Sequence, residues 1–370
     1  MMATTSIEWA TDVWTPVTGC DRVSPGCDHC YALTLAKRLK AMGSAKYQRD
    51  GDPRTSGPGF GVSLHADVLT EPFRWRKPRR IFVNSMGDLF HKDVPDLFIT
   101  QVFDVMEQAT QHTFQVLTKR HDRMRAFVQR REQQNREYAK KFDECPTEAM
   151  RHSPAARAAR QRSTAPPANV WLGVSVEDQK RADLRIPSLL ETPAAVRWIS
   201  AEPLLGPIRL PVCESCDGTG DHPDEWLPEG VADGGDCPAC NGSGWPTPGL
   251  DWVVAGGESG PGARPMHPDW VRGLRDQCVS AGVAFHFKQW GDWVPESLWL
   301  HRDTAPAGFL ATDGTHRPLV SGKPVAAPMS RGRDITIRRV GKGRAGRELD
   351  GRTWDQYPTP VSVGSEARHG

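Results

Sequence analysis

Short apolar stretches rich in Val, Ile, Phe and Trp recur along the chain, and stretches with helical periodicity separate several of them. Each apolar stretch has the length and composition of a β-strand and is bounded by turn-forming residues. We predict strands at 80–84, 113–118, 169–176, 195–200, 251–255 and 284–288, with a weaker one near 7–13. Apolar residues recur at helical spacing after Pro95 and after Pro268, as expected for helices that begin at a proline. The pattern predicts strand–helix units repeated along the chain.

The predicted strands begin at fairly regular intervals, apart from two long gaps. One gap holds a basic segment rich in Ala and Pro at about 128–168, and the other a glycine-rich segment at about 211–247. With both segments interpreted as insertions, the repeat calls for parallel strands joined by right-handed helical crossovers. The predicted fold class is α/β, a partial or closed parallel βα barrel over residues 1–300, with a doubly wound sheet as the alternative. Residues 301–370 form a C-terminal extension whose composition is typical of a loop supported by the body of the protein.

Composition places the chain among ordinary globular proteins. Its 370 residues suffice for a full hydrophobic core, and 38% apolar residues exclude a chain that is disordered throughout. The N-terminal residues lack a charged start followed by an apolar stretch, and no apolar run is long enough to span a membrane. We therefore expect a cytoplasmic protein with no membrane partner. Nine cysteines, most of them at the spacing of metal ligands, favour metal binding over disulfides.

Cys20, Cys27 and Cys30 crowd into one loop, with no fourth cysteine nearby. A closed structural zinc site needs four protein ligands, whereas an iron–sulfur cluster held by three cysteines keeps one iron free to bind a small molecule. The loop at 20–30 therefore indicates a cluster with an open position. The alternatives are a zinc site completed by His29 or a distant histidine, and three unrelated thiols.

The glycine-rich insertion carries a second cysteine motif. Two Cys-X-X-Cys pairs, each followed by glycines, stand close together there. The ligands are Cys213, Cys216, Cys237 and Cys240. Four thiolates in two tight pairs predict a closed tetrahedral zinc (Zn2+) site, with an auxiliary iron–sulfur cluster as the alternative. The repeat resembles the zinc modules of DnaJ-type chaperones, and this resemblance covers the insertion alone.

The three-cysteine loop leads into a stretch with helical periodicity that Gly43 can close. A cluster loop that feeds a helix resembles the radical S-adenosylmethionine (SAM) superfamily. Six residues separate the first two cysteines here, rather than the usual three, and His29 stands where an aromatic residue is usual. More narrowly, the chain is similar to an uncharacterised phage-associated family, in segments at 7–9, 16–20, 84–91, 116–120 and 256–264.

The resemblance implies a 4Fe-4S cluster and SAM as cofactors. It also implies an enzyme that cleaves SAM reductively and starts radical chemistry on an unknown substrate, with an electron donor such as flavodoxin or ferredoxin as partner. Polar side chains follow most of the predicted strands, where the carboxyl ends of a βα barrel carry its working groups. We expect catalytic roles for Lys119 and Glu202. The expected cofactor-binding residues are Asn84, Ser85, Gly256, Gly257 and Glu258, and a tight turn is the alternative for the two glycines.

A basic cluster at 74–80 surrounds Trp75 and suggests contact with nucleic acid. Its alternative is a solvated surface, because the net charge of +2 does not by itself imply a nucleic-acid partner. A nucleobase or nucleic acid is accordingly the candidate substrate. The alternative function is a non-catalytic, metal-stabilised nucleic-acid-binding phage protein.

Overall fold

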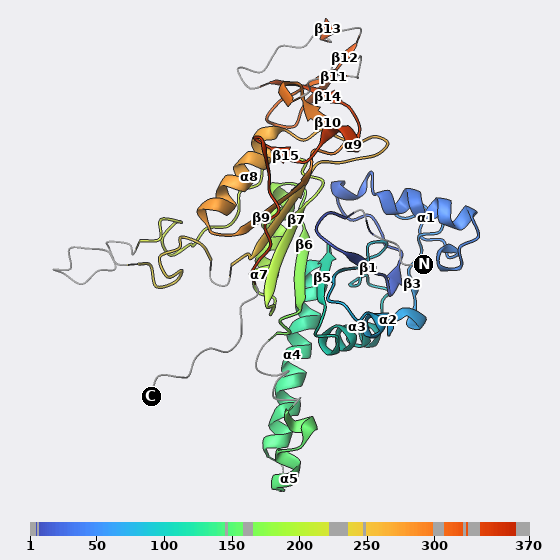
Figure 1. Cartoon of the computed structure of the whole chain (residues 1–370), viewed down its shortest axis with the longest axis vertical. Coiled ribbons are helices and arrows are strands. Elements are labelled where there is room, and N and C mark those ends of the chain that lie inside the picture. The colour runs from blue at the N-terminus through green and yellow to red at the C-terminus, as the bar shows by residue number, and fades with distance from the viewer. Residues whose placement is uncertain are drawn as a thin grey trace, which may run out of the picture. The chain divides into compact units, whose positions relative to one another are not determined.

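The computed structural model describes residues 5, 7–144, 147–157, 166–221, 236–246, 249–298, 307–320, 323–324 and 334–359. Within these residues the fold is mixed α/β, with one large sheet (Figure 1). The strands occupy the sheet in the same order as in the chain. They are β1 (Asp12–Trp14), β4 (Arg80–Val83), β5 (Thr113–Thr118), β6 (Val170–Ser175), β7 (Val196–Ala201), β8 (Trp252–Gly256) and β9 (Ala284–Gln289).

The strand order identifies the type of sheet. The pairs β1–β4, β4–β5, β5–β6 and β8–β9 are parallel. Since the order never reverses, every crossover advances in the same direction, whereas a doubly wound sheet reverses partway. β1 and β9 remain at the two edges, so the sheet is open. The predicted α/β class and partial parallel βα barrel are confirmed.

Helices connect consecutive strands, and two of them begin where the prolines predicted. Pro95 is the N-cap of one, and Pro268 is the first residue of another. The connecting helices are α3 (Asp96–Gln108), α4 (His121–Asp143), α7 (Gln179–Leu190) and α8 (Pro268–Ser280). The shorter elements are α1 (Tyr31–Ala41), α2 (Glu71–Arg74), α5 (Glu148–Arg151), α9 (Lys342–Ala345), η1 (Pro25–Cys27), η2 (Ala45–Tyr47), η3 (Ala66–Val68) and η5 (Glu296–Leu298). No helix in the described part of the chain is long and apolar enough to cross a membrane.

The basic segment at 128–168 begins as helix rather than as a separate insertion. Residues 128–143 continue α4 without a break. The reason is local, because this stretch consists of strong helix formers and includes an i,i+4 ion pair between Glu132 and Arg136, 2.8 Å long. Residues 145–146 and 158–165 of this segment lie outside the described residues.

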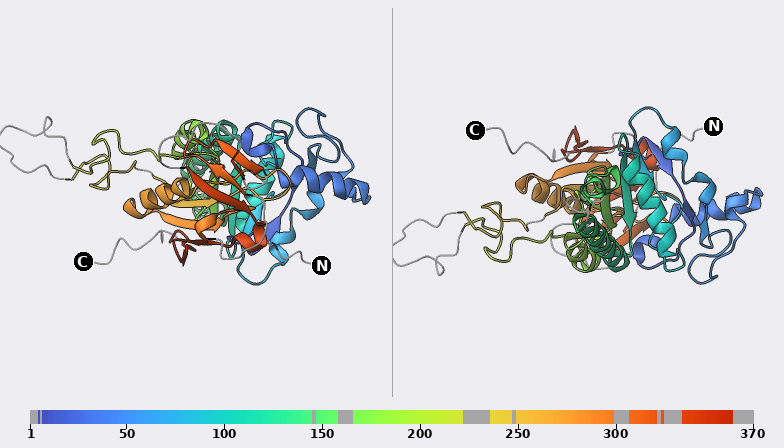
Figure 2. Two further views of the ribbon diagram at one scale, coloured as in Figure 1. Left: turned by 90° about the horizontal axis from the view of Figure 1, so that it is seen from above. Right: turned by 90° about the horizontal axis from the view of Figure 1, so that it is seen from below.

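The chain divides into two compact units. Unit 1 comprises residues 1–175, 187–198 and 358–370, and unit 2 comprises 176–186 and 199–357. In unit 1, α3 and α4 lie side by side (Figure 2), with the rings of Phe103 and Phe127 5.3 Å apart. The expected division near residue 300 stays a prediction.

Aromatic side chains pack against the strands of unit 1. The Trp9 ring lies 4.8 Å from that of Phe82 and 5.2 Å from that of Trp198. A Cβ atom at Gly173 would lie 2.5 Å from the Trp198 ring, so only glycine at that position lets the indole pack on β6. Side chains alternate along a strand, so Ser175 projects to the same face of β6 as Gly173. On this face of β6, an aromatic ring therefore packs over Gly173, and the polar Ser175 follows at the carboxyl end of the strand.

Unit 2 contains an antiparallel sheet, and four of its five strands lie in the segment at 301–370 whose composition suggested a loop. Its order is β10-β14-β11-β12-β13. The strands are β10 (Trp293–Pro295), β11 (Ala307–Leu310), β12 (His316–Val320), β13 (Lys323–Pro324) and β14 (Ile335–Arg339). Downstream, β15 (Glu348–Leu349) pairs with β16 (Arg352–Thr353). The Phe287 N–H then donates to the Trp354 carbonyl oxygen at 2.9 Å, so the chain covers the edge of β9.

Candidate metal centres and strand ends

The three-cysteine loop begins at a constrained glycine. Before it, β2 (Val17–Thr18) pairs with β3 (Ser63–Leu64). Gly19 follows with φ +91°, and a Cβ atom there would lie 2.4 Å from the Gly61 carbonyl oxygen. Its N–H donates to the Met86 carbonyl oxygen at 2.9 Å, beyond the carboxyl end of β4. The backbone thus fixes where the cysteine loop starts, at the end of the sheet where functional groups gather.

The cysteines of this loop are held in three different ways. Cys20 follows the constrained glycine, Cys27 ends η1, and Cys30 is the N-cap of α1. Burial raises the pKa of Cys20 to about 12 and also raises the pKa of Cys30. Negative charge on Cys27 adds to both increases, so its thiol lies within electrostatic reach of the other two. Burial therefore favours the neutral thiols of Cys20 and Cys30 over their thiolates, an effect that a bound cation would oppose.

The spacing of the sulfur atoms bears on the kind of metal centre. Thiolates bound to one zinc ion at about 2.3 Å lie about 3.8 Å apart. The four cysteines of the insertion have their sulfur atoms within 4.8 Å of one another. Among the described residues, no other group of three or more metal-binding side chains is so closely spaced. The loop cysteines do not meet that spacing, either alone or with His29. The kind of metal centre that the loop holds stays a prediction.

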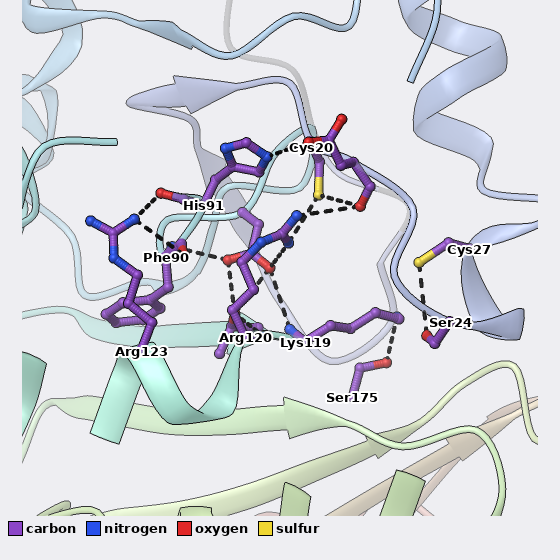
Figure 3. Close-up of polar contacts among 12 residues, drawn as sticks. Cys20, Ser24, Cys27, Phe90, His91, Lys119, Arg120, Arg123 and Ser175 are labelled. Atoms are coloured by element: carbon purple, nitrogen blue, oxygen red, sulfur yellow. Dashed lines mark hydrogen bonds and ion pairs between the residues drawn. The ribbon is translucent and has the colours of Figure 1, made fainter. Parts of the chain in front are cut away.

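Two cations from the end of β5 face the loop (Figure 3). Lys119 Nζ donates to Ser175 Oγ at 2.8 Å, and its charge lowers the pKa of Cys30 against the larger effect of burial. Arg120 Nη1 lies 3.2 Å from Cys20 Sγ and 2.8 Å from Asp88 Oδ2. Positive charge beside sulfur ligands stabilises an anionic centre.

A second set of contacts, made by Asp21, holds the loop next to Cys20. The hydroxyls of Thr55 and Ser56 donate to Asp21 Oδ1 at 2.7 and 2.9 Å, and His91 Nε2 lies 2.9 Å from Asp21 Oδ2. Partial burial would raise the pKa of Asp21, but these hydrogen bonds outweigh it and lower that pKa to about 2. The carboxylate is therefore ionised at neutral pH and ties the loop to segments distant in the sequence.

The predicted cofactor-binding segment after β4 contacts residues on either side of the cysteine loop. Asn84 has φ +63°, and its Oδ1 accepts a hydrogen bond from the Val17 N–H at 3.0 Å. Asn84 is 3% exposed, and its Nδ2 has no hydrogen-bond partner within the described residues. The Ser85 carbonyl oxygen accepts from the Tyr31 hydroxyl at 2.6 Å, directly after the third cysteine. A buried amide donor and a rarely occupied backbone conformation are typical of ligand sites.

Within unit 2, the predicted residues form a separate group. Lys288 Nζ lies 2.7 and 3.0 Å from the carboxylate oxygens of Glu202, at the ends of β9 and β7. A Cβ atom at Gly256 would lie 3.5 Å from Glu202 Cδ, so Gly256 borders this ion pair. The structure thus brings together Glu202, Gly256 and Lys288, which lies near the carboxyl end of β9.

Contacts of Gly257 and Glu258, the residues that follow Gly256, support a structural role for both. A Cβ atom at Gly257 would lie 1.9 Å from the Trp290 carbonyl oxygen, so close backbone approach requires glycine there. Both carboxylate oxygens of Glu258 bind the Arg264 guanidinium, at 2.7 and 2.8 Å. A bidentate ion pair of this kind fixes the loop after β8.

The four-cysteine site of the insertion has the geometry of a metal site. The sulfur atoms of Cys213 and Cys237 are 4.0 Å apart, and those of Cys216 and Cys240 are 3.7 Å apart. Both values are close to the spacing of thiolates on one tetrahedral zinc ion, about 3.8 Å. All four side chains are buried and form a cluster of their own. The site fits a metal ion such as zinc.

The glycines of the insertion shape its two halves alike. The N–H groups of Gly220 and Gly244 donate to Cys216 and Cys240 Sγ, each at 3.3 Å. Burial would raise the pKa of Cys216, but the Gly220 hydrogen bond and contacts from the other cysteines lower it to about 7. Both glycines have positive φ, +85° and +72°. Residues 222–235 and 247–248 of the insertion lie outside the described residues.

Comparison with known proteins gives one match. Residues 4–358 match the family described as "Protein of unknown function (DUF5131)". The chain belongs to this family. No curated protein and no solved structure matches it.

The basic cluster at 74–80 lies at the amino end of β4, opposite to the cysteine loop. Arg79 forms an ion pair with Asp12, and its guanidinium lies 5.0 Å from the Trp75 ring. The same ring packs edge-on against His112, at 5.8 Å. Trp75 is therefore engaged within the protein, and nucleic-acid contact by this cluster stays a prediction.

Sequence reasoning missed Asp21, His91 and Tyr31 as parts of the cysteine-loop site. Asp21 follows the first cysteine and Tyr31 follows the third, so position in the motif is the signal that could have found them. His91 follows β4 in a segment where an aspartate and a histidine stand close together. Their contacts join segments more than fifty residues apart, which no local pattern specifies.

Proposed function

We propose that this protein is a radical-SAM-like enzyme whose 4Fe-4S cluster binds Cys20, Cys27 and Cys30. The observation that carries the proposal is the loop itself. Three cysteines lie in one loop at the carboxyl ends of parallel strands, with a guanidinium 3.2 Å from the first sulfur. When bound, the cluster and SAM would supply one-electron reductive cleavage and a radical that abstracts hydrogen from the substrate.

The chain's own residues would bind and orient these groups. The three thiolates hold the cluster, and Lys119 and Arg120 offset its negative charge. The buried Asn84 Nδ2 is a donor available to a polar group of SAM or substrate. Aromatic packing on β6 and β7, by Trp9 and Trp198, excludes water from the interior below the polar groups.

The proposal extends to partners that supply and receive electrons or radicals. A flavodoxin or ferredoxin is the expected donor, because the cluster needs one electron for each cleavage. A nucleobase or nucleic acid remains the candidate substrate. The zinc site serves to fold the insertion, because the four buried cysteines form the core of its described part.

Metal analysis after anaerobic reconstitution with iron and sulfide tests the proposal. We expect a brown protein with about four irons per chain, in addition to zinc in the insertion. Replacing Cys20, Cys27 or Cys30 by Ala should abolish iron binding. Cys278→Ala is the matched control, because Cys278 is a buried cysteine of α8 outside both metal sites. Zinc alone, unaffected by changes in the loop, would refute the proposal.

A further inference from the structure

Arg120 contacts a cysteine sulfur atom, and several further hydrogen bonds hold its guanidinium in place. It is the N-cap of α4, directly after the end of β5, and its side chain is 15% exposed. Nη1 contacts Cys20 Sγ at 3.2 Å and Asp88 Oδ2 at 2.8 Å, while Nη2 donates to the Asp21 carbonyl oxygen at 3.3 Å (Figure 3). The guanidinium therefore has a defined position beside the first cysteine of the loop.

Asp88 is fixed as firmly as its partner. Its carboxylate accepts the Thr118 hydroxyl at 2.8 and 2.9 Å, the Phe90 N–H at 2.9 Å and the Lys119 N–H at 3.3 Å. Four donors, counting Arg120, hold this carboxylate in a buried position. The local charge at Cys20 is thus set by two opposite and rigidly placed groups.

We propose that Arg120, working against Asp88, sets the reduction potential of the cluster through its contact with Cys20, an inference that rests on the proposed function. Hydrogen bonds to cluster sulfurs and nearby net charge are established determinants of such potentials. Reduction adds one electron to the cluster, so a cation at a ligand sulfur favours the reduced form. Removing Arg120 makes the potential more negative, and removing the charge of Asp88 makes it more positive.

The same helix offers a matched control. Arg123 is one turn further along α4 and carries the same charge. Its guanidinium donates to the backbone carbonyl oxygens of His91 and of Val94, the latter at 2.6 Å, and to Asp96 Oδ1 at 2.8 Å. These partners are backbone and a surface carboxylate rather than a cysteine. Arg123→Gln therefore removes an equal charge without removing a sulfur contact.

The test is an EPR-monitored redox titration of reconstituted protein, with dithionite as the one-electron reductant. We expect Arg120→Gln to bind iron like the wild type with a more negative potential, and Arg120→Lys to shift less because it keeps the charge. Asp88→Asn should shift in the opposite direction, which a general loosening of the loop would not produce. Arg123→Gln should titrate like the wild type.

Three outcomes would overturn this inference. One is an unchanged potential in iron-loaded Arg120→Gln. Another is a shift of the same sign and size in Arg123→Gln, which would indicate a bulk charge effect. The third is loss of iron from both Arg120 variants with retention in Arg123→Gln, which would make Arg120 a residue that only holds the loop. Wild-type protein that takes up no iron would instead refute the proposed function, and this inference with it.

Discussion

Removing Arg185 should destabilise unit 2 through a buried ion pair. Arg185 Nη1 lies 2.9 Å from Glu177 Oε2, and the two side chains are 4% and 0% exposed. Glu177 follows the end of β6, and its carbonyl oxygen accepts the Leu205 N–H at 2.7 Å, so the pair supports the connection beyond that strand. In Arg185→Met the carboxylate of Glu177 stays buried and loses the nearer of its two cationic partners.

The expected magnitude follows from burial. Breaking a buried pair by removing one partner costs about 3–5 kcal/mol. Arg181 Nε remains 4.0 Å from Glu177 Oε1 and offsets part of this, so we expect about 3 kcal/mol. Arg181→Met is the matched control on the same helix. Its pairs with Asp178 and Glu177 are longer and partly exposed, so it should cost at most about 1 kcal/mol.

Hydrogen exchange followed by mass spectrometry measures the local opening free energy of peptides covering 176–210. This measurement avoids assuming that the whole chain unfolds in one step. Arg185→Met should lower that free energy far more than Arg181→Met. The double variant Glu177→Gln, Arg185→Met should recover much of the loss, because no buried charge remains. Equal effects of the two single variants, or no recovery in the double variant, would refute the reasoning.

Three further predictions concern the loop, the insertion and the basic cluster. Gly19→Ala should abolish iron binding, because the added Cβ atom would collide with the backbone of Gly61. Gly43→Ala is the control and should keep iron, because Gly43 also has a positive φ but a Cβ atom there would meet no atom within 4 Å. Iron retained in both variants would contradict this prediction. Cys216→Ser should speed proteolysis of the insertion and leave iron content unchanged, as judged by gel and metal analysis. Parallel loss of iron would show that the two metal sites depend on each other. If the basic cluster binds nucleic acid, neutralising Arg76 and Lys77 should lower the salt dependence of binding by about two units of slope. An unchanged slope in a binding titration would exclude the cluster.

The sheet could be predicted from the sequence because its strands are locally encoded. Most strands of a parallel sheet are buried on both faces, so each appears as a continuous apolar run between turn residues. The six main runs, at 80–84 through 284–288, correspond to β4 to β9 with small differences at their ends. The four-cysteine site was equally predictable, since two Cys-X-X-Cys pairs indicate a metal site by their spacing.

The antiparallel sheet of unit 2 was not predictable in the same way. β10 pairs with β14, more than thirty residues further along the chain. β10 has only three residues, and β14 is more than half polar. Pairing at such separation depends on tertiary packing rather than on local propensity. The same limit applies to the loop site, where Asp21 and His91 meet only after the chain has folded. Sequence identified the cysteines, and the structure added the charges around them.

The most direct test of the central claim is the EPR spectrum of the reduced, reconstituted protein before and after addition of SAM. The account predicts a 4Fe-4S signal that depends on Cys20, Cys27 and Cys30, and that changes when SAM binds the iron left open by three-cysteine ligation. Cys278→Ala should give the wild-type result. A protein without a cluster signal, or a cluster signal that SAM leaves unaltered, would contradict the account.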